Sequence, residues 1–194
     1  MSTLTYAKRK RLKQELEGWL QKRRFHVFLT LTLNTSSSAD AVSRKFKAWL
    51  AQVDRWLIGN NWHKDATNCV FAVAAVEHLN TNAHLHILLR LPRHARHKSP
   101  LRQAKKYFRF WTKVIRSGGC CLSTGPDQGA VSYILKCATD EDAFNSIMFS
   151  NQFHGKSRRK CRRKTARYRA RGFNLGENVN CKIIITHKPR SHRE

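Results

Sequence analysis

A glutamate and two histidines that lie close together in the sequence are the strongest candidates for chemistry in this chain. The stretch from Glu77 to His86 reads EHLNTNAHLH, with turn-forming residues at its centre and apolar segments on both sides. Alternate side chains of a β-strand point to the same face, so His84 and His86 project together. If residues 79–82 form the turn of a hairpin, Glu77 lies opposite His84, and directly opposed residues share a face. The pattern therefore predicts two imidazoles and one carboxylate on one small patch.

Such a trio suits a divalent cation that keeps coordination positions open for water or substrate. Two nitrogens and one carboxylate are compatible with Mn²⁺ or Zn²⁺. Mg²⁺ prefers oxygen ligands, but it can serve where a phosphate supplies some of them. The alternative is a solvated sheet face on which the two histidines have no ligand role. His78 is expected to face the opposite side of the sheet and to stay outside the ligand set.

Tyr133 and Lys136 form a second candidate pair. Positions i and i+3 of a helix share a face, so a phenol and an ammonium group are expected to be neighbours there. A tyrosine beside a cation, next to a metal that polarises a phosphate, can attack a phosphodiester. For the pair taken alone, the alternative is a core tyrosine with a lysine whose charged end reaches solvent.

The elements that must position these residues alternate between helices and strands. Helical patterns cover residues 4–24, 39–58, 99–116 and a short stretch containing 132–137, and strand patterns cover 25–33, 69–78, 83–91, 120–123 and 179–186. This order, with one clear hairpin, predicts an α+β fold. We expect a mainly antiparallel central sheet of about five strands with flanking helices, ferredoxin-like or RRM-like in type.

The composition indicates one folded domain with a polyanionic partner. The chain has 194 residues, of which 38 are Lys or Arg and 12 are Asp or Glu, so its formal net charge is +26. The 41% share of hydrophobic residues argues against wholesale disorder. Nucleic acid is the first candidate partner and an anionic membrane surface the second. The membrane alternative is weak because the longest apolar run, residues 70–76, is far too short to span a bilayer.

Cysteine spacing and the N-terminal residues favour a reduced, cytoplasmic protein. The six cysteines contain no C-x-x-C pair, which disfavours ordinary zinc ribbons and fingers. Reduced thiols are the simplest interpretation. The basic residues near the N-terminus precede no apolar stretch, so no secretory signal is expected.

The densest charge run lies at residues 156–171, with ten Lys or Arg in sixteen positions. Cations interleaved with aromatic residues suit single-stranded or stem-loop nucleic acid, and the alternative is a solubilising arm. The predicted nucleic-acid-binding residues are Lys156, Arg158, Arg159, Lys160, Arg162, Arg163, Lys164, Arg167, Arg169 and Arg171. The basic helix at the N-terminus is a second candidate surface. The five tryptophans, Trp19 among them, are expected in the core rather than in base stacking, and Trp62, in a polar loop, is the one to test for stacking.

Taken in order, these segments resemble the three motifs of the HUH endonucleases, above all the rolling-circle replication initiators of plasmids, phages and small single-stranded-DNA viruses. The strand FLTLT at 28–32 is similar to the first motif. Glu77 with HLH at 84–86 is similar to the second, and Tyr133-x-x-Lys136 to the third. The resemblance implies an HUH nuclease core at residues 25–140. A basic helix at 1–24 precedes it, and a basic arm at 141–178 and a final strand with a polar tail at 179–194 follow.

The resemblance also implies a reaction, DNA nicking and joining. A metal ion, Mn²⁺ or Mg²⁺, would be held by Glu77, His84 and His86 and would polarise the scissile phosphate of single-stranded or hairpin origin DNA. The Tyr133 oxygen would attack phosphorus, giving a 5′-phosphotyrosine and a free 3′-hydroxyl, while Lys136 would steady the phosphate or the phenolate. Because both histidines must be neutral to bind metal, activity is expected to fall below about pH 6.

The resemblance leaves the biological setting open. Cys137 and Asp140 stand where two-tyrosine members carry a second tyrosine, so a single-tyrosine enzyme is implied. No phosphate-binding G-x-x-x-x-G-K-[ST] motif occurs, so unwinding would fall to a host helicase and extension to a host polymerase. A transposase of the HUH type and a mobilisation relaxase are alternatives. A non-catalytic RRM-like nucleic-acid-binding protein is a third, which should carry exposed aromatics on its middle strands.

Overall fold

The computed structural model describes residues 5–62, 68–95, 100–136, 147–153 and 183–187. Its helices are α1 (Tyr6–Gln21), α2 (Ala39–Ile58), α3 (Pro100–Val114) and α4 (Gln128–Ile134), with 3₁₀ turns η1 (Arg93–Ala95) and η3 (Ser150–Phe153). Its strands are β1 (Val27–Thr32), β2 (Phe71–Glu77), β3 (His84–Arg90), β4 (Gly119–Thr124), β5 (Ile147–Phe149) and β6 (Ile183–His187). Every predicted element has a counterpart in this order, and β5 is additional.

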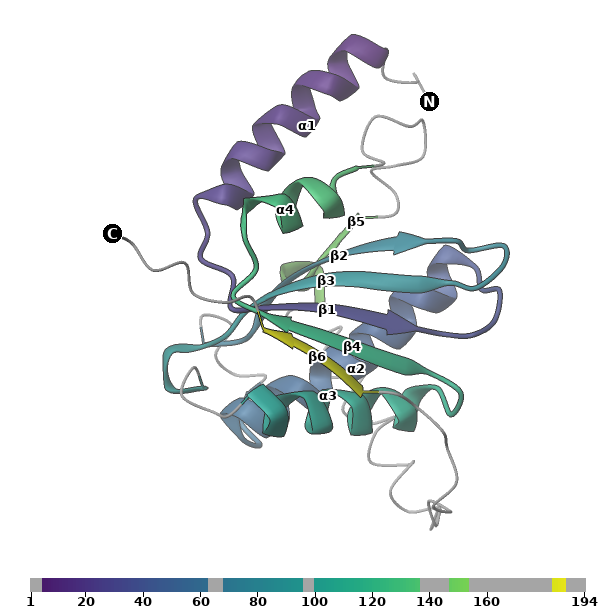
Figure 1. Cartoon of the computed structure of the whole chain (residues 1–194), viewed down its shortest axis with the longest axis vertical. Coiled ribbons are helices and arrows are strands. Elements are labelled where there is room, and N and C mark those ends of the chain that lie inside the picture. The colour runs from purple at the N-terminus through teal and green to yellow at the C-terminus, as the bar shows by residue number, and fades with distance from the viewer. Residues whose placement is uncertain (1–4, 63–67, 96–99, 137–146, 154–182, 188–194) are drawn as a thin grey trace.

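The strands form one sheet in the order β5-β2-β3-β1-β4-β6. Each neighbouring pair is antiparallel except β4 and β6, which are parallel. The α+β class and the mainly antiparallel sheet are therefore confirmed. In Figure 1 the helices α2 and α3 lie on one side of the sheet, and α1 and α4 lie on the other.

The larger core fills the space between the sheet and the pair α2 and α3. Strand residues of one parity, such as Leu29 and Ile87, point to that side and are fully buried. Trp49 and Trp111 pack against them from the two helices, and the Trp49 indole donates a hydrogen bond to the Tyr107 carbonyl oxygen at 3.1 Å. This packing holds the sheet in place from the face opposite the candidate site.

The opposite face of the sheet has a smaller core under α1 and α4. Leu20 of α1 and Val131 of α4 pack there on Val73 and Leu88 of the sheet. This face also carries the candidate metal ligands. Glu77 is four residues from Val73 on β2 and His86 is two residues from Leu88 on β3, and residues an even number of positions apart on a strand share a face. The site therefore lies on the same side of the sheet as α1 and α4.

Two tryptophans differ from the sequence-based expectation. Trp62 is completely buried, where it packs on Ala51 and Cys69, so its ring cannot stack on a base. Trp19, which was expected in the core, is 40% exposed and lies under the guanidinium group of Arg23 at 3.7 Å. A loop position near polar residues does not reveal whether the chain folds the ring inward.

Several sequence-based predictions concern residues outside the described ranges. The basic run at 156–171, with all ten of its predicted nucleic-acid-binding residues, is one of them. Among the described cysteines, Cys120 and Cys121 are free thiols, and the Cys69 thiol donates a hydrogen bond to the Trp62 carbonyl oxygen at 3.3 Å. No helix in the described part of the chain is both long and apolar enough to cross a bilayer.

Candidate metal centre and nucleophile

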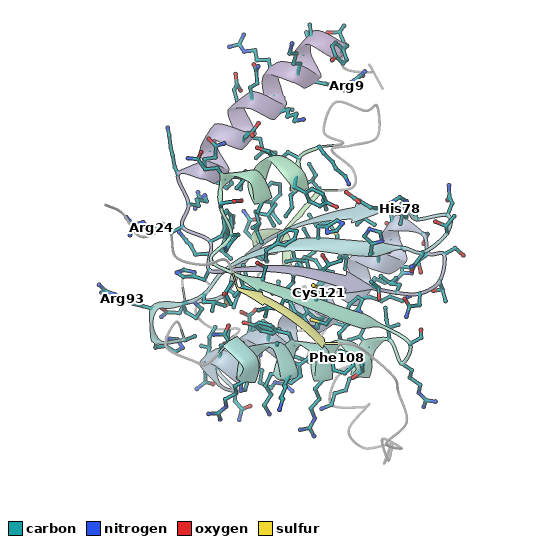
Figure 2. All side chains as sticks on the ribbon, in the orientation of Figure 1. Arg9, Arg24, His78, Arg93, Phe108 and Cys121 are labelled. Atoms are coloured by element: carbon teal, nitrogen blue, oxygen red, sulfur yellow. The ribbon has the colours of Figure 1, made fainter. Side chains whose placement is uncertain are left out.

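The hairpin of β2 and β3 brings the predicted ligands together. Glu77 pairs directly with His84, and Ala75 pairs with His86, which is the predicted register. The Thr81 amide donates to the His78 carbonyl oxygen at 3.1 Å and closes the turn. His78, at this turn, and Arg24 and Arg93 mark opposite ends of the sheet (Figure 2). The patch of two imidazoles and one carboxylate is therefore confirmed.

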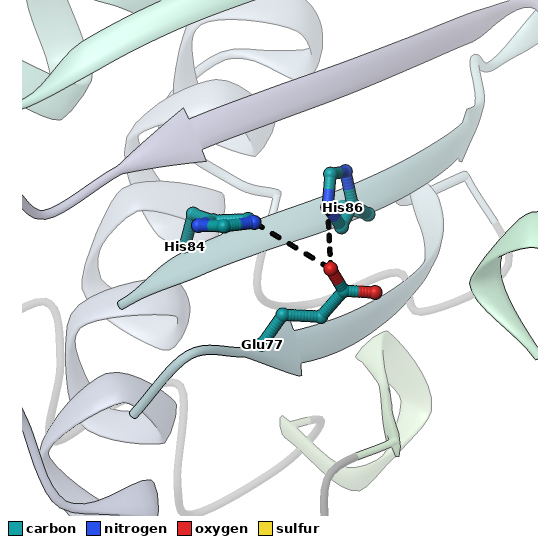
Figure 3. Close-up of side chains that lie close together, drawn as sticks. All are labelled: Glu77, His84 and His86. Carbon is teal, nitrogen blue, oxygen red and sulfur yellow. Dashed lines mark hydrogen bonds and ion pairs between the residues drawn. The ribbon is translucent and has the colours of Figure 1, made fainter. Parts of the chain in front are cut away.

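Glu77 directs one carboxylate oxygen at both histidines (Figure 3). Its Oε2 lies 3.2 Å from His86 Nε2 and 3.5 Å from His84 Nε2. One donor atom from each of the three residues lies within 4.8 Å of the other two, so the group can hold a metal ion. The donor chemistry of one carboxylate and two imidazoles fits a divalent transition-metal ion. The side chains of Glu77 and His86 are 9% and 7% exposed and that of His84 is 19% exposed, which leaves His84 on the more open side.

The other carboxylate oxygen of Glu77 accepts a hydrogen bond from Lys136. The distance from Lys136 Nζ to Glu77 Oε1 is 2.9 Å. Burial alone would raise the pKa of Glu77, but the Lys136 hydrogen bond and the electrostatic interactions with His86, Lys136 and His84 together lower it. The same hydrogen bond raises the pKa of Lys136. The ion pair therefore keeps Glu77 ionised and able to serve as a ligand.

Each histidine is oriented through its second ring nitrogen. His84 Nδ1 lies 3.0 Å from the backbone oxygen of Asn82, and His86 Nδ1 lies 3.0 Å from Thr30 Oγ1. Burial lowers the pKa of His86, and Glu77 opposes this shift only in part, so His86 favours the neutral form that binds metal. Such outer contacts fix ring orientation and are a regular part of histidine metal sites.

Tyr133 reaches the same patch from α4. Asp127 begins this helix, where its Oδ1 accepts a hydrogen bond from the Ala130 amide at 3.1 Å. The Tyr133 hydroxyl lies 3.4 Å from His86 Nε2, and the Tyr133 side chain is half-exposed. A hydrogen bond between Ser132 and Glu17 ties α4 to α1. The predicted nucleophile and the predicted ligands are thus neighbours, although 47 sequence positions separate Tyr133 from His86.

Lys136 is a neighbour of Tyr133, but not through a shared helix face. The helix α4 ends at Ile134, and Lys136 lies in the turn that follows. Its Nζ nevertheless lies 4.3 Å from the centre of the Tyr133 ring. The turn forms because the Lys136 amide donates to the Tyr133 carbonyl oxygen at 3.1 Å. The expected proximity is therefore present, while the expected helical geometry is wrong.

His78 also differs from its prediction. Its backbone has φ +54°, a left-handed conformation that interrupts the alternation of the strand. The ring turns back to the ligand face, 4.9 Å from the His84 ring, and its Nε2 lies 4.0 Å from Glu77 Oε2. A third imidazole therefore borders the site, outside the group of three ligand atoms.

Phe28 and Thr30 of β1 complete the surroundings of His86, and sequence reasoning gave neither a role in the site. The Phe28 ring is parallel to the His86 ring at 5.9 Å and meets the Tyr133 ring edge-on at 6.1 Å. The alternation of apolar and Thr residues in β1 predicted a half-buried strand. It could not predict that Thr30 pairs with His86, because that requires the register between β1 and β3.

Comparison of the chain with family models, with curated proteins and with solved structures found no match.

Proposed function

We propose that this protein is a metal-dependent endonuclease that nicks and rejoins single-stranded DNA with Tyr133 as its nucleophile. The observation that carries the proposal is the 3.4 Å separation of the Tyr133 hydroxyl from His86 Nε2, a candidate metal ligand. A nucleophile beside a cation site is an arrangement that promotes phosphodiester transesterification. The ordered resemblance to the HUH motifs gives the same class of reaction, with initiation of rolling-circle replication as its setting.

Glu77, His84 and His86 would hold the divalent ion, for which Mn²⁺ and Mg²⁺ are the proposed identities. The bound ion would supply positive charge to a non-bridging oxygen of the scissile phosphate, which makes phosphorus more electrophilic. Glu77 offers one oxygen to this site while Lys136 binds the other. The protein thus contributes one formal negative charge and two neutral imidazoles as ligands.

The remaining chemistry belongs to Tyr133 and Lys136. The phenol oxygen attacks phosphorus, an O–P bond forms, and the bond from phosphorus to the 3′ oxygen breaks. The phenol proton passes to solvent, and the leaving oxygen takes up a proton to become a 3′-hydroxyl. Lys136, 4.3 Å from the Tyr133 ring centre, favours the negative charge that develops on the phenol oxygen. The phosphotyrosine ester conserves the energy of the original bond, so rejoining needs no nucleotide.

The excess of positive charge supports nucleic acid as the substrate. A net charge of +26 on 194 residues favours association with a polyanion at low salt. Exposed cations of α1, including Lys8 and Lys10, lie on the helix that packs against α4. The helix that carries the nucleophile therefore has a basic neighbour on the same side of the sheet.

A covalent trapping experiment tests the proposal. The protein is incubated with Mn²⁺ and a pool of random-sequence single-stranded oligonucleotides, some with hairpins, and is then denatured and separated by electrophoresis. We expect a DNA adduct that survives denaturation, and sequencing of its DNA would define the preferred site. Wild-type protein that forms no adduct with the pool, in either Mn²⁺ or Mg²⁺, would contradict the proposal.

Substitutions at two tyrosines separate the specific reaction from nonspecific labelling. Tyr133→Phe removes the nucleophilic oxygen and should abolish the adduct, whereas Tyr6→Phe alters an exposed tyrosine of α1 and should leave it intact. His84→Ala removes a proposed metal ligand and should abolish the adduct, whether or not metal is added. An adduct that persists in Tyr133→Phe would assign the nucleophile elsewhere.

A further inference from the structure

The two candidate histidine ligands differ in what their Nδ1 atoms contact. His84 faces a backbone carbonyl oxygen of Asn82, which can only accept a hydrogen bond. His86 faces the hydroxyl of Thr30, which can either donate or accept. Both Nδ1 contacts are 3.0 Å long. The difference therefore lies in chemistry and not in distance.

The Asn82 carbonyl oxygen fixes the proton of His84. Because a carbonyl oxygen accepts, His84 Nδ1 must carry the hydrogen, and in the neutral ring Nε2 then carries a lone pair. Nε2 lies farther from its own acceptor, 3.5 Å from Glu77 Oε2, so the shorter 3.0 Å contact to Asn82 decides which nitrogen of the neutral ring carries the hydrogen. His84 is thus in the tautomer that a metal ion requires at Nε2 before any ion arrives.

His86 has the opposite arrangement. Its Nε2 lies 3.2 Å from Glu77 Oε2, and an ionised carboxylate can only accept. Nε2 therefore carries the hydrogen, and Nδ1 accepts the hydrogen bond from the Thr30 hydroxyl. The Tyr133 hydroxyl oxygen, at the longer distance of 3.4 Å, can share the Nε2 hydrogen and does not change this assignment.

We propose that Thr30 is a positioning residue whose hydroxyl reverses its hydrogen bond to His86, so that this ring can release Nε2 for a divalent cation. This inference rests on the proposed metal site. With a cation bound at Nε2, that atom would give its proton to solvent and Nδ1 would take one up from solvent, so the ring would stay neutral. The Nδ1 hydrogen then needs an acceptor in a side chain that is only 7% exposed, and Thr30 Oγ1 is in place.

The reversal requires a hydroxyl at this position of β1. Thr30 pairs with His86 across β1 and β3, so the contact is set by the sheet register and not by a flexible loop. Valine has nearly the same shape but can neither donate nor accept, and it would leave a buried imidazole N–H unpaired in the loaded site. Serine keeps the hydroxyl. The two substitutions therefore separate the hydrogen bond from packing.

The first test measures Mn²⁺ binding by calorimetry on the full chain, without DNA. Thr30→Val should weaken binding by about 10- to 100-fold, the usual cost of losing an outer partner of a histidine ligand, and Thr30→Ser should bind nearly as well as wild type. Thr112→Val is the control, since the Thr112 hydroxyl donates to the Arg109 carbonyl oxygen within α3, on the other side of the sheet. It should leave the affinity unchanged.

The second test reads the ring proton directly by nitrogen-15 NMR of the histidine side chains. In protein stripped of metal with a chelator, His86 should be protonated at Nε2 and His84 at Nδ1. Added Zn²⁺, a diamagnetic probe, should move the His86 hydrogen to Nδ1 and leave His84 unchanged. This measurement uses the wild-type chain, so it does not depend on how the variants fold.

The outcomes distinguish this inference from the proposed function. Wild-type affinity in Thr30→Val, or binding in Thr30→Ser as weak as in Thr30→Val, would overturn the role of the hydroxyl. So would a His86 ring already protonated at Nδ1 before metal is added. Wild-type protein that binds no Mn²⁺ would overturn the proposed metal site and this inference with it.

Discussion

Glu77 contacts two kinds of partner with its two oxygens. Oε2 faces the histidines, and Oε1 accepts the hydrogen bond from Lys136 at 2.9 Å. A carboxylate that is 9% exposed loses most of its hydration, and its ionised form must be stabilised by the surrounding protein. Lys136 supplies this stabilisation from the turn after α4. The lysine therefore acts on the candidate metal site as well as on the tyrosine.

Replacement of Lys136 by methionine should raise the pKa of Glu77. The substitution keeps an unbranched side chain but removes the hydrogen bond and the charge that oppose the effect of burial. Because the carboxylate would then hold its proton to higher pH, metal binding should also begin at higher pH. Carbon-13 NMR titration of the Glu77 carboxyl group measures the shift.

Lys105→Met provides the control for that titration, because Lys105 is exposed on α3, on the other side of the sheet. It should leave the Glu77 titration unchanged. An unchanged Glu77 pKa in Lys136→Met, or equal shifts in both variants, would show that the ion pair does not hold the carboxylate in its ionised form.

At the residue scale, the sequence predicts the ligands but not their partners. Glu77, His84 and His86 could be predicted because one hairpin contains all three and strand alternation determines their faces. The contact between Thr30 and His86 joins residues 56 positions apart, so it depends on a register that no local pattern encodes. The sequence also predicts the wrong face for the His78 ring, because strand alternation cannot foresee the left-handed φ that turns the ring to the ligand face.

At the element scale, the end of β1 depends on a close approach between Gly118 and α3. The Trp111 indole donates a hydrogen bond to the Thr32 carbonyl oxygen at 2.7 Å. A Cβ atom at Gly118 would lie 2.4 Å from Trp111 Nε1 and 2.9 Å from that carbonyl oxygen. The missing side chain is what allows α3 to reach the last residue of β1.

Gly118→Ala should therefore destabilise the fold by about 1–3 kcal/mol, the usual range for overpacking.

For the same substitution at Gly18, the expected change in the free energy of unfolding has the opposite sign. Gly18 lies within α1 with nothing within 4 Å of the added Cβ atom. Gly18→Ala should stabilise the protein by about 0.5–1 kcal/mol through helix propensity. Urea denaturation of both variants measures the difference, and a neutral Gly118→Ala would refute the steric argument.

Periodicity predicts the long elements well and the short ones poorly. The helix α2 has the predicted bounds because its buried residues recur along one face and Gly59 ends it with φ +96°. The strand β5 has only three residues, too few for alternation to be recognised. The helix α4 ends before Lys136 although the spacing of the pair is helical, since the polypeptide leaves the helix at Leu135.

At the scale of the whole molecule, basic helices lie on both sides of the sheet. On α1, Lys8, Lys10 and Lys13 lie in the first turns, with no acidic residue before Glu15. On α3, Lys105, Lys106 and Lys113 lie on the other side of the sheet (Figure 1). Because α1 packs against α4, which carries Tyr133, the DNA of the proposed reaction would pass closer to α1 than to α3.

Charge removal on α1 should thus reduce the salt dependence of single-stranded DNA binding more than charge removal on α3. Replacement of Lys8, Lys10 and Lys13 by glutamine should lower the slope of log affinity against log salt by about 2, if each lysine neutralises one phosphate. The same replacement of Lys105, Lys106 and Lys113 should leave the slope nearly unchanged. Fluorescence anisotropy over a salt series measures both slopes, and equal reductions would exclude a preferred DNA path along α1.

The spacing of the site residues has a consequence for the order of folding. Glu77 and His86 are nine positions apart, whereas Tyr133 is 47 positions from His86. Closing the longer loop costs about 1.4 kcal/mol more entropy, since each doubling of length adds roughly 0.6 kcal/mol. The hairpin that carries Glu77 and His86 can therefore form early, while Tyr133 and Lys136 reach it only when α4 docks. Under the proposed function, a chain arrested before α4 docks would lack both the nucleophile and the lysine that keeps Glu77 ionised, so a half-folded protein could not cut the cell's own single strands.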